Sequence, residues 1–150
     1  MQLERFDITS RGDIVRLVDD FYAEIRQDTI LGPIFDDVAR VDWAAHLPRM
    51  YDFWDAVLFG TPGFKGNPLA VHRALARQAP LNSTEFDRWI ALFHLTVDAL
   101  FAGPVADEVK RRALRVAAVM QHAIAADLAG EHPATGQQPP GGPPRDAVPS

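Results

Sequence analysis

Apolar residues recur at three- and four-residue spacing in every long segment of this chain, and no segment alternates apolar and polar residues for long. The first spacing places apolar side chains on one face of an α-helix, whereas a half-buried strand needs the second. The first stripe follows a capping box at Ser10 and Asp13 and ends before Gly32. Its members are Ile14, Leu17, Val18, Phe21, Tyr22 and Ile25. The pattern predicts an all-α fold.

A second helix is expected over residues 43–59, where Gly60 ends the apolar pattern. Pro48 lies inside this segment and removes one backbone hydrogen bond. We therefore expect a kink there, or a later start than the periodicity indicates. The inward face comprises Trp43, His46, Leu47, Met50, Phe53, Trp54 and Val57.

The remaining helices begin at recognisable caps. Asn67 followed by Pro68 predicts the start of a short helix of about ten residues. Ser83 or Thr84 is expected to cap a long fourth helix, and a fifth should run to about Leu128. The inward residues of these last two helices are Phe86, Trp89, Ile90, Phe93, Val97, Leu100 and Phe101, then Val105, Val109, Ala113, Val116, Ala117, Met120 and Ile124.

The end of the chain differs in composition from the rest. Residues 130–150 hold six of the 12 prolines, four of the 10 glycines and no aromatic residue. Such a segment buries too little apolar area to offset the entropy lost on ordering. We expect one folded domain over residues 1–129 and a disordered tail over 130–150, which includes the PxxP pattern from Pro140 to Pro143.

Composition excludes several classes of function. With 20 acidic and 15 basic residues, the chain lacks the positive field that draws proteins to nucleic acid or anionic membranes, so we expect neither partner. The absence of cysteine excludes disulfides, thiol nucleophiles and thiolate-ligated metals. The charged N-terminus and the lack of a long apolar run predict a cytoplasmic protein.

Common catalytic motifs, such as GxGxxG, the P-loop, GxSxG and HExxH, do not occur in the sequence. Two histidines, His46 and His72, instead lie on strongly apolar helix faces, accompanied by Tyr22, Trp54 and Trp89. Buried polar tips need partners. In one interpretation, these groups form hydrogen bonds with one another and with nearby backbone carbonyls. In the other, one imidazole binds the iron of a large apolar cofactor, and the remaining donors face the opposite side of that cofactor.

Six motifs follow one another between residues 5 and 128. They are Phe21-Tyr22, Leu31-Gly32-Pro33-Ile34-Phe35, Trp43 with His46, Phe53-Trp54, Gly66 with Pro68 and His72, and Arg88-Trp89 with Leu92-Phe93. In this order they resemble the group III truncated haemoglobins, small bacterial globins. The double-glycine loop motifs of the other truncated groups are not evident. The resemblance implies a shortened globin fold enclosing haem b, although Pro48 and the long tail depart from the pattern.

The resemblance also implies roles for particular residues. His72 would be the proximal iron ligand, and Tyr22, Trp89 and His46 would stabilise a bound diatomic gas. A kink at Pro48 gives His46 a second reading, as a gate turned toward solvent. The residues implied to contact the haem are His72, Phe35, Met50, Phe53, Trp54, Leu69, Trp89 and Phe93.

We therefore expect a haem-binding globin that takes up oxygen, nitric oxide or carbon monoxide. Hydrogen-bond donors in a dry pocket would stabilise the bound gas. One alternative is a peroxidase-like or nitric oxide detoxifying enzyme, which needs an external electron donor; a carboxylate bonded to His72 would favour it. Another is a haem-free sensor or adaptor whose pocket is filled by side chains. Arg49 and Arg73 either pair with haem propionates or only solvate their helices. No role is expected for His94, His122 and His132.

Overall fold

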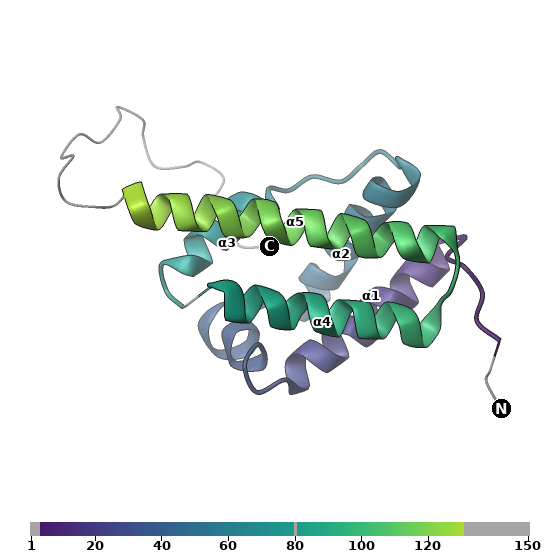
Figure 1. Cartoon of the computed structure of the whole chain (residues 1–150), viewed down its shortest axis with the longest axis horizontal. Coiled ribbons are helices and arrows are strands. Elements are labelled where there is room, and N and C mark those ends of the chain that lie inside the picture. Colours follow the sequence, from purple (N-terminus) through teal and green to yellow (C-terminus); the bar gives the residue numbers. More distant parts are fainter. Residues whose placement is uncertain (1–3, 80, 131–150) are drawn as a thin grey trace.

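The computed structural model describes residues 4–79 and 81–130 and is helical throughout (Figure 1). Its elements are α1 (Arg11–Gln27), the π-helical turn η1 (Ile34–Val38), α2 (Trp43–Phe59), α3 (Pro68–Ala76), α4 (Ser83–Leu100) and α5 (Pro104–Gly130). One isolated bridge, Phe6 to Phe101, is the only β-type pairing in the described ranges. The all-α prediction is confirmed.

The expected tail beyond residue 130, with its PxxP pattern and His132, lies outside the described residues. Within the described ranges, no helix combines the length and the apolar character needed to cross a bilayer.

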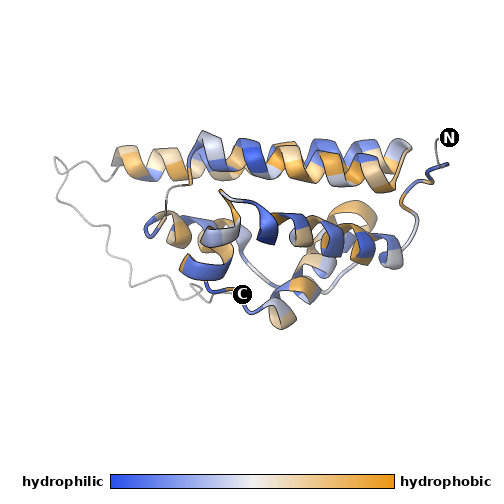
Figure 2. Cartoon of the chain, turned by 90° about the horizontal axis from the view of Figure 1, so that it is seen from below, coloured by the Kyte–Doolittle hydropathy of each residue, from blue (hydrophilic) through white to orange (hydrophobic). Residues whose placement is uncertain are grey.

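The longest helices form the frame of the fold. α4 and α5 run antiparallel and side by side, and α1 packs against both α2 and α4 (Figure 1). Figure 2 shows α5 lying along one side of the other helices, with apolar and polar turns alternating along it. The short α3 packs on α5.

The inward face of α1 lies in the core. Every member of its predicted stripe is buried, which confirms that face as the inner one. Small residues on α5 let this helix pack closely against α4. Ala106 and Ala113 are at most 1% exposed, and Val109 on the same helix is fully buried. The largest fully buried side chains are Phe21, Phe93, Ile8, Ile14, Leu17, Ile25, Val18, Val97 and Val109.

The cap of one predicted helix needs correction, and one of the two effects expected of Pro48 does not occur. The cap of α4 is Asn82 and not the expected Ser83 or Thr84, because the Asn82 side chain and Glu85 form a reciprocal capping box. The second helix was expected to be kinked at Pro48 or to start late, and the late start is wrong. α2 begins at Trp43 and continues through Pro48, since one lost hydrogen bond near the first turn does not end a helix.

The sequence did not predict η1, which follows a close backbone approach at Gly32. A Cβ at this position would lie 2.8 Å from the carbonyl oxygen of Arg26, so only glycine fits there. The Ala39 N–H then donates to the Ile34 carbonyl over 2.8 Å, five residues back, which is the π-helical pattern.

Asp28 ties this segment to α4. Its carboxylate, whose side chain is 3% exposed, accepts from the N–H groups of Ile30 at 3.1 Å and Leu31 at 3.0 Å, and from Nε of Arg88 at 2.7 Å. Burial alone would raise the pKa of Asp28, but the Leu31 N–H, the Arg88 guanidinium and the Ile30 N–H together lower it. Asp28 therefore fixes the start of the segment that leads into η1.

We predict that Asp28→Ala lowers the free energy of unfolding by about 1–3 kcal/mol, because the buried Leu31 N–H loses its acceptor. Asp52→Ala is the matched control. Asp52 is 45% exposed and shares Arg11 with Asp55, so its loss should change stability by less than about 1 kcal/mol. Urea denaturation of both variants measures the difference, and equal losses would contradict the role given to Asp28.

Candidate functional site

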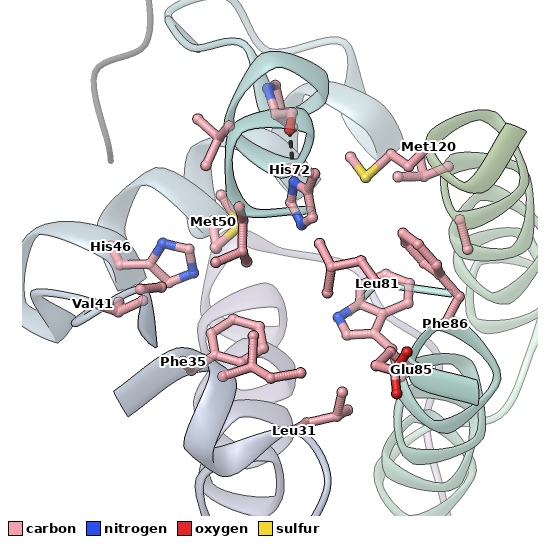
Figure 3. Close-up of a pocket in the computed structure, with 18 of the residues that line it drawn as sticks. Leu31, Phe35, Val41, His46, Met50, His72, Leu81, Glu85, Phe86 and Met120 are labelled. Atoms are coloured by element: carbon pink, nitrogen blue, oxygen red, sulfur yellow. Dashed lines mark hydrogen bonds between the residues drawn. The ribbon is translucent and has the colours of Figure 1, made fainter. Parts of the chain in front are cut away.

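A large apolar cavity lies between α1, α2, α3, α4 and α5 (Figure 3). The space between its walls, including the open mouth, is about 1180 Å³. Its lining is Tyr22, Leu31, Ile34, Phe35, Ala39, Val41, His46, Met50, Phe53, Trp54, Pro68, Val71, His72, Leu75, Leu81, Glu85, Phe86, Trp89, Val116, Ala117 and Met120.

His72 lies on α3, which starts where Asn67 caps the Ala70 N–H and Pro68 occupies the first turn. Its Nδ1 is 2.6 Å from the Pro68 carbonyl oxygen. Because a carbonyl only accepts, Nδ1 carries the proton and donates, which leaves the lone pair on Nε2. Figure 3 shows this bond as a dashed line, with the other ring nitrogen of His72 pointing into the cavity.

The environment keeps His72 neutral. Burial lowers its pKa below the ordinary value, and the hydrogen bond to Pro68 opposes that shift only in part. A neutral imidazole with a free Nε2 is the form that binds metals. His72 can therefore act as a metal ligand through Nε2, from the side of the cavity that α3 forms.

His46 is on the first turns of α2 and is 9% exposed. Neither of its ring nitrogens has a hydrogen-bond partner in the described protein. Burial, with smaller contributions from the charges of His72 and Arg49, lowers the pKa of His46 to about 4. An unpaired buried polar group costs about 1–3 kcal/mol, so this imidazole lacks a partner that the chain itself does not supply.

Tyr22 is 7% exposed and borders the same cavity from α1. Its ring stands edge-on to His46, with centroids 5.1 Å apart, and 5.4 Å from the ring of Trp43. Burial raises the pKa of Tyr22 far above its ordinary value, so the hydroxyl stays protonated and can donate a hydrogen bond.

Trp43 closes this aromatic cluster from outside. Its Nε1 donates to Asp36 at 3.0 Å, and the Arg26 guanidinium lies 4.9 Å from its ring centroid. The ring also stacks on Phe35, with centroids 5.9 Å apart. These contacts hold η1 and the start of α2 together beside Tyr22 and His46.

Trp89 and Trp54 line the cavity from α4 and α2, and both stack on Phe93 at centroid distances of 5.6 and 5.1 Å. Phe93 itself is fully buried and does not border the cavity. Leu69 also lies outside the lining and packs against a second apolar cluster around Phe86. These two predicted contact residues therefore stand behind the walls.

The structure brings the other predicted site residues together. His72, Phe35, Met50, Phe53, Trp54 and Trp89 line the cavity with Tyr22 and His46. Arg49 and Arg73 are not in the lining. Nε of Arg73 lies 2.9 Å from Asp127 Oδ2, an ion-pair distance without the alignment of a hydrogen bond.

Sequence reasoning missed part of the lining. Phe86, Val116, Ala117 and Met120 were expected only as inward core residues, because an apolar side chain that borders a cavity has the same periodicity as one that packs in a core. Glu85 carries no such signal. It lines the cavity while its Oε1 accepts the Asn82 N–H at 2.9 Å.

Comparisons with known proteins agree with this arrangement. A sequence model of the family described as bacterial-like globin matches residues 7–126. The chain is 26% identical over 123 residues to the group 3 truncated hemoglobin of Campylobacter jejuni subsp. jejuni serotype O:2, covering 80% of this chain and 94% of that protein. The crystal structure of group III truncated hemoglobin from Campylobacter jejuni matches with a TM-score of 0.71 and 26% identity, covering 81% of this chain and 95% of that one. The resemblance and the globin fold expected from the motifs are confirmed, and this chain belongs to the bacterial-like globin family.

Proposed function

We propose that this haem-binding globin holds haem b with His72 as the proximal iron ligand and takes up a diatomic gas on the opposite side. The observation that carries the proposal is the 2.6 Å bond from His72 Nδ1 to the Pro68 carbonyl, which leaves Nε2 free toward an apolar cavity. When bound, the haem would supply an iron atom that can bind both an imidazole and a gas.

The residues present fit a haem better than a bare metal ion. The described residues contain no group of three or more His, Cys, Asp or Glu side chains that could hold a metal. A single imidazole therefore needs a cofactor that brings the other metal ligands.

The walls would hold the cofactor mainly by apolar contact. Phe35, Met50, Phe53, Trp54 and Trp89 line the cavity and would contact the macrocycle. Leu69 and Phe93 would support these walls from behind, since neither reaches the cavity.

Tyr22, Trp89 and His46 would stabilise the bound gas. The Tyr22 hydroxyl and the Trp89 indole N–H are donors on cavity-lining side chains, and His46 has two unpaired ring nitrogens. Preorganised donors in a pocket with few waters interact more strongly with partial negative charge than exposed donors do.

The partner of His72 favours ligand binding over peroxidase-like chemistry. A carboxylate on Nδ1 would make the imidazole more electron-donating, but Nδ1 donates to the neutral carbonyl of Pro68. The open cavity also argues against a haem-free adaptor, for which we expected a pocket filled by side chains. The external electron donor needed for turnover and the cytoplasmic location stay predictions.

We predict that His72→Ala loses the haem, or regains a normal absorption spectrum only when imidazole is added to replace the missing ligand. His122→Ala is the control, because His122 is exposed on α5 and should leave the spectrum unchanged. An unaltered ferrous spectrum in the His72 variant would show that another residue holds the iron.

We predict that Tyr22→Phe raises the oxygen dissociation rate about three- to tenfold, because one hydrogen bond contributes about 0.5–1.5 kcal/mol and about 1.4 kcal/mol is a factor of ten. Carbon monoxide should respond less, since it carries less negative charge when bound. Stopped-flow measurements of both gases separate the loss of a donor from a general loosening of the pocket.

Tyr51→Phe is the matched control for this prediction. The Tyr51 hydroxyl donates to Asp19, and Tyr51 is not part of the cavity lining. Its removal should leave both dissociation rates unchanged. Equal rates in the Tyr22 variant and the wild type would remove Tyr22 as the main donor while leaving the role of His72 intact.

A further inference from the structure

His46 borders the cavity with both of its ring nitrogens lacking a hydrogen-bond partner within the described protein. Both ring nitrogens are buried and unpaired, although nearly all buried polar groups in proteins have a partner. The rings around it, Tyr22 at 5.1 Å and Trp43 at 5.6 Å, meet it edge-on and provide no hydrogen bond to it. The missing partner therefore has to come from the cavity that His46 lines.

His46 and His72 border this cavity from different walls. His46 comes from α2 and His72 from α3, and Figure 3 shows both rings at its edge. A neutral imidazole has one nitrogen with a lone pair, which is a good ligand for iron. The site therefore offers two imidazoles for one cofactor.

The turn that carries His46 is held less firmly than the rest of α2. Pro48 has no N–H, so the carbonyl of Ala44 lacks its partner four residues on. Asp42 precedes the helix but makes no side-chain cap bond. The His46 N–H still donates to the Asp42 carbonyl at 2.8 Å. Two of the usual stabilising bonds of a helix start are therefore missing from the turn that carries His46.

We propose that His46 is a second axial ligand of the haem iron when no gas is present and that an incoming gas displaces it. This inference rests on the proposed function, since it requires haem held by His72. The exchange breaks one iron–nitrogen bond and forms one iron–gas bond, with no change in oxidation state or proton count. The apparent gas affinity falls with the fraction of protein in which His46 occupies the iron.

Met50 is the competing ligand. It lies one turn after His46 on α2, lines the same cavity and carries a thioether that can also bind haem iron. His46 is preferred because its unpaired nitrogens need a partner, whereas a thioether is stable in apolar surroundings without one.

The test uses full-length haem-loaded protein, prepared without added imidazole. Electron paramagnetic resonance and visible absorption should show a low-spin ferric iron in the wild type, because two axial protein ligands give that state. His46→Leu should lose the low-spin signal and become high-spin, while the matched control Met50→Leu should keep it.

Carbon monoxide binding to the ferrous protein gives a second readout. In the wild type the observed rate should level off at high carbon monoxide concentration, because His46 must leave first. In His46→Leu the rate should rise linearly. Pro48→Ala restores the N–H to Ala44 and should reduce the low-spin fraction, so an unchanged fraction would refute the part assigned to Pro48.

Each contrary outcome points to a different error. A wild-type protein with haem but a high-spin iron overturns the role of His46 and leaves the proposed function standing. A low-spin signal that survives in His46→Leu and is lost in Met50→Leu assigns the position to Met50. Failure of the wild-type chain to bind haem contradicts the proposed function itself.

Discussion

The hydrogen bond between His72 Nδ1 and the Pro68 carbonyl is the constraint on which the site depends. Because the carbonyl can only accept, the 2.6 Å contact requires the proton on Nδ1 and leaves the lone pair on Nε2. Pro68 is well suited to this place because, in the first turn of α3, it has no helical use for an N–H. The Asn67 side chain caps the same turn through the Ala70 N–H. The orientation of His72 is thus set by the residues that start α3.

The two sides of the cavity differ in how firmly the chain holds them. On the α3 side, a capped first turn and a side-chain bond to the backbone fix His72. On the α2 side, the helix has no side-chain cap, Pro48 removes a hydrogen bond, and His46 has no partner. Packing of Trp43 against Phe35, and its bond to Asp36, supports this side from outside. With His72 as the proposed metal ligand, the wall that carries this ligand is therefore the one that the chain holds by more hydrogen bonds.

Much of this arrangement could be predicted from the sequence because periodicity and caps are local signals. The α1 stripe, the range of α2 and the start of α3 at Pro68 were all predicted from spacing and cap residues. The π-helical turn at Ile34 could not be, since it depends on a close approach between Gly32 and the Arg26 carbonyl. The place of Glu85 in the cavity lining could not be predicted either, because a carboxylate that caps a helix is expected to face solvent. Phe86, which lines the cavity, and Phe93, which stands behind its wall, lie on the same face of α4, about two turns apart. Their difference depends on where the neighbouring helices separate along α4, which spacing does not specify.

A haemin titration of the wild-type protein, followed by visible absorption, tests the central claim most directly. We expect an intense absorption band that grows until one haemin is bound per chain, because the cavity offers one imidazole, His72, that is fixed by a hydrogen bond. A protein that stays colourless and leaves the haemin spectrum unchanged would contradict it, because the cavity and the free Nε2 of His72 would then serve another ligand.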